Sequence, residues 1–181
     1  MTYAVPQFLG HQNISAILLS LSDQSIIAIG MTILLISGGF DLSVGSTVAL
    51  SGAVTAIWLN SGMPVPAAIS LGLGVGVLIG LINGLIIAEI GINPFITTLG
   101  MMSLARGMLM VVTDGQNISG LPESFTVLGQ GSFCGIQYPI LYSVVLVIIG
   151  DFILRKSRFF RQNYYIGGNE KAAILSGINV K

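Results

Sequence analysis

Long uncharged stretches separated by short polar segments run through the chain, and this pattern predicts a series of membrane-spanning helices. The clearest stretch, residues 66–88, carries no charge and would form a helix about 34 Å long, against a hydrocarbon core of about 30 Å. Four further stretches are apolar but shorter or interrupted: residues 24–40, 42–59, 94–113 and 139–154. We therefore expect a single membrane domain over residues 1–181, an all-α polytopic bundle of about five transmembrane helices.

The composition supports a membrane protein and excludes two other classes. Of the 181 residues, 53% are apolar and only 8% are charged, against roughly 25% charged in a soluble domain. The seven Lys and Arg are balanced by seven Asp and Glu, which argues against binding to nucleic acid. Cys134 is the single cysteine, so the sequence does not encode a disulfide-stapled secreted module.

The distribution of charge predicts which end of the bundle faces the cytoplasm. Residues 1–150 hold five acids and one base, whereas the last 31 residues hold two acids and six bases. Basic residues beside a span mark its cytoplasmic side, so we expect residues 155–181 to be cytoplasmic. Counting spans backwards places the polar segment 114–138, and also the N-terminus, on the outer side.

Both ends of the sequence suggest that it belongs to a longer protein. An N-terminus on the outer side without a signal sequence favours a further helix upstream. At the other end, the sequence stops soon after a short predicted helix, with no further apolar segment. We expect additional membrane helices before and after this stretch.

Four glycines recur every fourth residue within the clearest span: Gly72, Gly76, Gly80 and Gly84. Small residues at this spacing let two helix backbones approach closely, which is a main source of packing energy in lipid. The spacing therefore predicts one helix face that packs against a neighbour. Asn83 lies beside this face and would need a hydrogen-bond partner across the interface.

Asp41 and Arg106 are the two charges whose surroundings are least expected in a membrane. Asp41 follows Gly38 and Gly39 at a break between apolar stretches, where it either caps the next helix or lies near a translocation route. Arg106 lies within residues 94–113, where a mid-membrane position costs roughly 2.5–3.5 kcal/mol. Arg106 therefore either faces a cavity or a carboxylate, or extends its side chain to the outer interface.

Helix caps can be read at two positions. Asn93 is suited to cap a helix whose first residue is Pro94. Asn169 is suited to cap a short helix that begins at Glu170, and Gly177 is suited to the position just after its end. This second helix would present a small rigid surface on the cytoplasmic side, either to a partner or to the bilayer.

Four motifs, taken in order, resemble the permease subunit of bacterial binding-protein-dependent ABC sugar importers of the ribose, xylose, galactose and autoinducer-2 type. The motifs are SGGFDLSVGS (37–46), GLINGLI (80–86), NPFITTLGMMSLARG (93–107) and IGGNEKAAILSGINV (166–180). Members of that family are longer, about 300 residues or more. The resemblance covers almost the whole chain and does not indicate which sugar is carried.

The resemblance implies a pore formed with a second permease subunit, identical or not, in the bacterial inner membrane and in contact with its lipids. It also implies two partners, a cytoplasmic ATPase subunit that uses the ATP and a periplasmic sugar-binding protein, with no cofactor on this chain. The residues it assigns to ATPase coupling are Asn169, Glu170, Ala172, Ala173 and Gly177. The residues it assigns to the translocation path or membrane core are Gly38, Gly39, Asp41, Ser43, Asn93, Thr97 and Arg106.

Two other functions fit the residues. An ATP-independent channel or secondary transporter would use Asp41 and Arg106 as coupling or selectivity charges. A truncated permease fragment would have no activity of its own. The sequence contains no Walker A motif, zinc-ligand spacing or nucleophile elbow, so we expect no enzymatic activity and no metal site.

Overall fold

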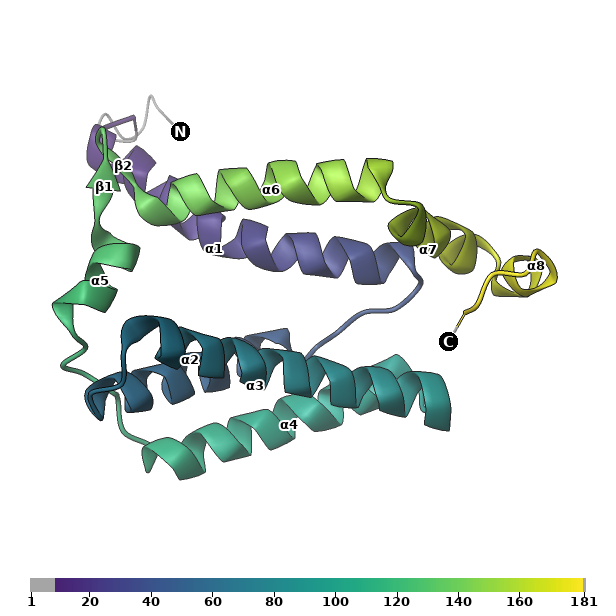
Figure 1. The fold of residues 1–181 in the computed structure, drawn as a ribbon, viewed down its shortest axis with the longest axis horizontal. Coiled ribbons are helices and arrows are strands. Elements are labelled where there is room, and N and C mark those ends of the chain that lie inside the picture. Colours follow the sequence, from purple (N-terminus) through teal and green to yellow (C-terminus); the bar gives the residue numbers. More distant parts are fainter. Residues whose placement is uncertain (1–8, 181) are drawn as a thin grey trace.

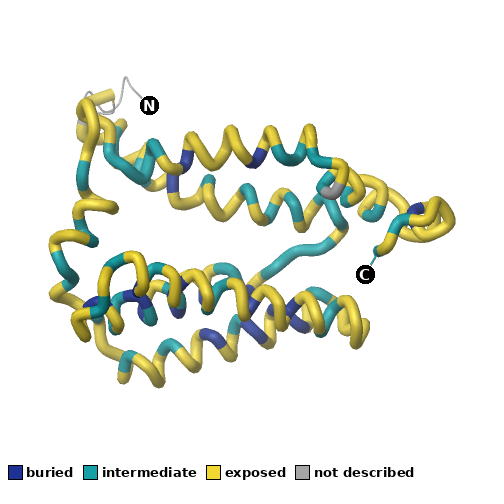
Figure 2. Tube along the Cα trace, in the orientation of Figure 1, coloured by how far each residue is buried: buried dark blue, intermediate teal, exposed yellow. Residues whose placement is uncertain are grey.

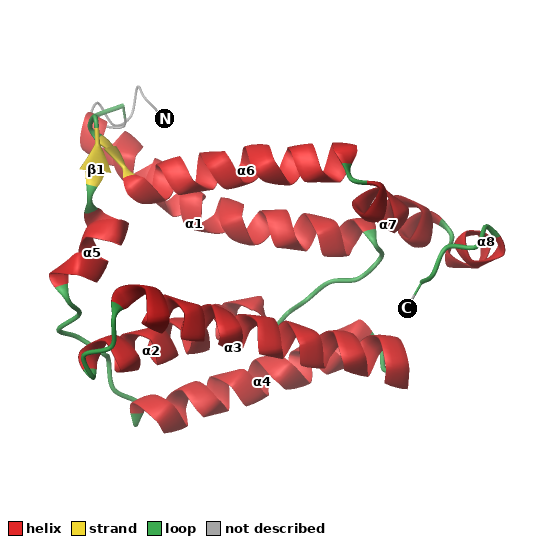
Figure 3. Cartoon of the chain, viewed as in Figure 1, coloured by secondary structure: helices red, strands yellow, loops and turns green. Residues whose placement is uncertain are grey.

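The computed structural model describes residues 9–180, and almost all of its regular structure is helical (Figure 3). The helices in chain order are α1 (His11–Ile36), α2 (Val44–Asn60), α3 (Val65–Leu85), the π-helical turn η1 (Ile86–Ile90), α4 (Pro94–Thr113), α5 (Glu123–Gln130), α6 (Tyr138–Lys156), α7 (Arg158–Gly168) and α8 (Glu170–Leu175). Two short strands, β1 (Ser132–Phe133) and β2 (Ile136–Gln137), pair antiparallel before α6. The expected all-α membrane bundle is confirmed.

Four described helices are long and apolar enough to cross a membrane: Gln12–Ile36, Val65–Ile90, Pro94–Thr113 and Tyr138–Lys156. The fifth expected span, residues 42–59, corresponds to α2, which begins only at Val44 and has 17 residues. A helix of that length rises about 25 Å, less than the hydrocarbon thickness of about 30 Å. The bundle therefore has four full-length helices and one shorter helix.

The first helix differs most from its expected bounds of 24–40. Polar residues upstream of 24 do not interrupt the helix, because the hydroxyl of Ser22 donates to the Leu18 carbonyl within it, at 2.7 Å. The helix stops at Ile36 because Gly38 takes a left-handed conformation, with φ of +87°, which L side chains rarely adopt. The amide of Gly39 then closes the last turn by donating to the Leu34 carbonyl at 2.9 Å.

The other bounds differ by smaller amounts. The α4 range of 94–113 is the predicted one, and the Asn93 cap is confirmed, since its side-chain oxygen accepts from the Phe95 amide at 2.8 Å. The predicted 66–88 and 139–154 helices become 65–90, including η1, and 138–156. Two segments hold more structure than expected, since α5 and the strands lie within 114–138, and 155–181 carries α7 as well as α8.

The helices pack in two groups joined at both ends (Figure 1). In one group α1 packs on α6, and in the other α2 packs on both α3 and α4. Buried positions concentrate in the second group, where Leu50, Ile79, Met101 and Ala105 form the main apolar cluster (Figure 2). In the described chain, residues 37–43 connect the groups beside α7, and residues 114–137 connect them at the opposite end.

Candidate functional site

The short helix predicted to begin at Glu170 is present as α8, and its predicted caps are confirmed. The Asn169 side-chain oxygen accepts a hydrogen bond from the Ala172 amide at 3.1 Å. Beyond the helix end, Gly177 has φ of +78°, and the Ser176 hydroxyl donates to the Ala172 carbonyl at 2.9 Å. Because both ends are closed by local hydrogen bonds, a helix of only six residues keeps its shape.

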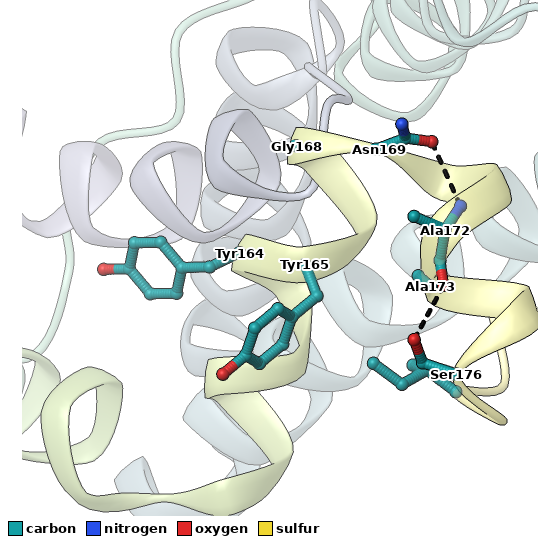
Figure 4. A pocket seen from close by; sticks show the side chains of 8 residues that line it. Tyr164, Tyr165, Gly168, Asn169, Ala172, Ala173 and Ser176 are labelled. Atoms are coloured by element: carbon teal, nitrogen blue, oxygen red, sulfur yellow. Dashed lines mark hydrogen bonds between the residues drawn. The ribbon is translucent and has the colours of Figure 1, made fainter.

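A pocket of about 420 Å³ lies between α7 and α8. Its lining residues are Tyr164, Tyr165, Gly168, Asn169, Ala172, Ala173, Ser176 and Ile178. Figure 4 shows Tyr164 and Tyr165 projecting from α7 and the capped turn of α8 beside them. Of the residues predicted to couple to an ATPase, this pocket brings three together, Asn169, Ala172 and Ala173.

The side chains of α8 divide into an inner and an outer set. Ala173 is buried, with 3% of its surface exposed, whereas Glu170 is exposed. Ile174 and Leu175 are apolar and nevertheless 52% and 89% exposed. The exposure of these two side chains could not be predicted from the sequence, because an apolar pair in a short helix is equally consistent with packing inward. An exposed apolar pair next to the most basic part of the chain is suited to contact either another protein or the surface of the bilayer.

A second predicted cluster lies at the break between α1 and α2. One oxygen of Asp41 accepts from both the amide and the hydroxyl of Ser43, at 2.7 and 2.6 Å. The Ser43 hydroxyl in turn accepts from the Asn83 side-chain amide at 3.2 Å, which joins α3 to the start of α2. Ser43 is fully buried and Asn83 is 4% exposed. The partner that the sequence required for Asn83 is therefore Ser43.

The start of α4 lies against the same break. The rings of Phe40 and Phe95 meet edge to face with centroids 6.1 Å apart. Just beyond, Thr97 is buried, and within the described chain its hydroxyl has no hydrogen-bond partner. The same holds for the hydroxyl of Thr47 and the side-chain oxygen of Asn83. Buried polar atoms of this kind normally find a partner in protein or water, so this end of the α2–α4 group is suited to hold polar molecules.

Arg106 is exposed on α4, and no carboxylate in the described chain forms an ion pair with it. Asp41 and Arg106 are thus not brought together. Elsewhere in the described chain, an ion pair joins Arg155 to Asp151 at 2.6 Å, one turn apart near the end of α6. Both side chains are largely exposed, so the pair contributes little to stability.

The glycine face of α3 packs over only half of its length. A Cβ at Gly72 would overlap the Thr55 hydroxyl of α2 and lie 2.9 Å from the Ser51 carbonyl oxygen. A Cβ at Gly76 would make an ordinary contact with the Ser51 hydroxyl at 3.5 Å. A Cβ at Gly80 or Gly84 would meet no described atom within 4 Å.

Comparison with known proteins places the chain in a transporter family. Residues 13–181 match the model of the branched-chain amino acid transport system permease component. The chain belongs to this permease family. The family is one of transport proteins. No solved structure matches the chain.

Curated relatives of this permease include several sugar transporters. The chain is 44% identical to the ribose import permease protein of Bacillus subtilis over 177 residues, covering 97% of the chain and 55% of the relative. It is 39% identical to an L-arabinose transporter permease of Azospirillum brasilense, covering 99% and 53%. For the D-allose permease of Escherichia coli the identity is 37%, with 96% and 54% covered. The chain spans about half the length of the curated relatives it matches.

Proposed function

We propose that this chain forms part of the membrane-spanning permease of an ATP-driven sugar importer in the bacterial inner membrane. Ribose, arabinose and allose permeases are its relatives, which favours a monosaccharide as the substrate class. In this proposal the helices supply a path that opens alternately to the two sides. A separate ATPase supplies the energy, and a periplasmic binding protein and a second permease subunit complete the importer. Transport requires that these partners bind the two states of the path with different affinities.

The observation that carries the proposal is the exposed apolar pair on α8. Leu175 is 89% exposed at the basic end of the chain, and the charge of residues 155–181 supports a cytoplasmic location for them. A rigid, capped helix that presents Ile174 and Leu175 is suited to dock into a cleft of the ATPase subunit. Glu170 lies on the same short helix and would add a charge to that surface.

The remaining predicted residues have separate roles in this proposal. Asn169 and Gly177 hold the ends of α8, and Ala172 and Ala173 line the pocket beside α7. The cluster around Asp41 and Ser43, with Thr97 of α4 close to the same break, would form a polar part of the path. Arg106 would lie in the membrane core, where its exposed side chain would face another subunit or another part of the permease.

The test is co-purification of the chain with the cognate ATPase subunit, followed by ATP-dependent sugar uptake in proteoliposomes. Leu175→Ser and Glu170→Lys should reduce both ATPase binding and sugar uptake, because they alter the proposed docking surface. Both side chains are exposed, so the changes should leave the fold intact. Gln162→Ser is the matched control, since Gln162 is an exposed polar residue of α7. Ala173 is a poorer test site, because it is buried and a bulky residue there would disturb α8 itself.

Retention of the ATPase by wild type and by Gln162→Ser, together with its loss from Leu175→Ser, would support docking through α8. If Leu175→Ser binds the ATPase and supports uptake as well as wild type does, α8 is not the docking surface. Uptake without any ATPase subunit would instead favour the channel or secondary transporter.

A further inference from the structure

One backbone contact joins the cytoplasmic segment to the membrane helices with no room for a side chain. A Cβ at Gly167, near the end of α7, would overlap the carbonyl oxygen of Ile36 and lie 3.1 Å from the amide nitrogen of Gly38. The obstructing atoms are all backbone, which cannot move aside as the tip of a side chain can. The backbone of Gly167 is helical, a conformation that any residue can adopt. Glycine is therefore required here because the two backbones approach closely.

The other side of this contact is the end of α1. Gly38 has φ of +87°, and its amide donates to the Leu35 carbonyl at 3.1 Å, so the turn is held by the last turn of α1 itself. A Cβ built at Gly38 would lie 3.7 Å from the Cα of Gly167. The two glycines thus bring the backbone of α7 directly against the point where α1 becomes the linker of residues 37–43.

This linker leads at once into the buried polar cluster. Phe40 contacts Phe95 of α4, and Asp41 and Ser43 are hydrogen-bonded to each other and through Ser43 to Asn83 of α3. In the described chain it is also the connection between the two helix groups on the side where α7 lies. A displacement of α7 would therefore be passed from backbone to backbone into the linker, and from there to α2, α3 and α4.

We propose that Gly167 is a positioning residue for transport, through which movement of α7 and α8 shifts the linker and the Asp41–Ser43–Asn83 cluster. This inference rests on the proposed function, because the movement begins when the ATPase subunit binds ATP. The joint lies between α7 and the end of α1, and the cluster at the start of α2 responds to its movement.

Hydrogen exchange measured on the full chain bound to its ATPase subunit tests the joint. Exchange is compared with and without a non-hydrolysable ATP analogue, in α8 and in residues 37–47. In the wild type both regions should respond to the analogue, with a change in exchange of about fivefold or more, the size of a typical coupling between two sites. Gly167→Ala should keep the response of α8 and lose that of residues 37–47.

Gly30→Ala is the matched control. It makes the same change in the interior of α1, the helix whose end Gly167 contacts, where a Cβ would meet no described atom within 4 Å. Its exchange should follow the wild type in both regions. In proteoliposomes Gly167→Ala should hydrolyse ATP but fall on the order of tenfold in sugar uptake per ATP, while Gly30→Ala should not.

Three outcomes separate the inference from the function on which it rests. If the analogue changes α8 but not residues 37–47 in the wild type, the joint does not transmit movement, and this result needs no variant. If Gly167→Ala keeps the full response of residues 37–47, Gly167 is not the positioning residue. If α8 of the wild type neither binds the ATPase nor responds to the analogue, the proposed function fails as well.

Discussion

Replacement of Gly72 by alanine should loosen the contact between α2 and α3. Among the described glycines of α2, α3 and α4, Gly72 leaves the least room for a side chain. The added Cβ would overlap the Thr55 hydroxyl, which at present donates to the Ser51 carbonyl at 2.9 Å. If Thr55 rotates away, the Cβ still lies 2.9 Å from that same carbonyl oxygen, which is backbone and cannot rotate. The two helices must therefore move apart.

The magnitude follows from a comparison with Gly80→Ala. Both changes remove a glycine from the interior of α3, which favours the helix by about 0.5–1 kcal/mol. Only the change at Gly72 forces atoms into an occupied space, which costs about 1–3 kcal/mol. Since the helix term is common to both variants, Gly72→Ala should be less stable than Gly80→Ala by about 1–3 kcal/mol.

Trp58 makes the measurement direct, because it is the single tryptophan of the chain and lies on α2, one turn beyond Thr55. Its fluorescence can be followed during denaturant-induced unfolding in detergent micelles for the wild type and both variants. Thr55→Ala combined with Gly72→Ala should recover part of the loss, since one of the two obstructing atoms is then gone. Equal stability of Gly72→Ala and Gly80→Ala would refute the account of the α2–α3 contact.

Two further predictions concern other contacts. In unfolding measurements, Gly150→Ala should destabilise the α1–α6 pair by about 1 kcal/mol, because its Cβ would lie 2.9 Å from the Ile29 Cγ2. Adding Ile29→Ala should relieve this overlap, whereas adding Ile29→Val should not, because valine keeps the Cγ2 atom. Asn169→Ala should raise hydrogen exchange at the Ala172 amide through loss of a cap worth about 1 kcal/mol, whereas Asn169→Asp should keep exchange near the wild-type rate. Unchanged exchange in Asn169→Ala would show that α8 does not depend on its cap.

Local signals explain why several helices could be placed from the sequence. The start of α4 is set by Asn93 and Pro94, and the two ends of α8 are set by Asn169 and Gly177, all within a few residues of the bonds they make. The predicted start of α1 is too late, because the uncharged stretch used to predict it begins only after Asp23, whereas the helix extends through Asp23 and the polar residues before it. In the structure the Ser22 hydroxyl bonds within the helix, and a helix can hold such residues at little cost.

The candidate site could be predicted only in part. The sequence indicated that Asn83 needs a partner and that Asp41 lies at a break, but not that Ser43 joins them. It identified the body of α8, yet the exposure of Leu175 follows from how α8 folds back on α7. Nothing in the tail sequence singles out Gly167 over Gly168, since both are glycines at the end of the same helix.

The sequence by itself determined the class of protein, the approximate length of its spans and the caps of its short helices, because hydrophobicity and capping act over one or a few turns. Only the tertiary structure decided which of four evenly spaced glycines lie close to another helix: among the described residues, Gly72 and Gly76 do, and Gly80 and Gly84 do not. The physical reason is that a close contact depends on a second segment far away in the chain. A glycine permits such an approach, and the fold alone decides whether another backbone makes it.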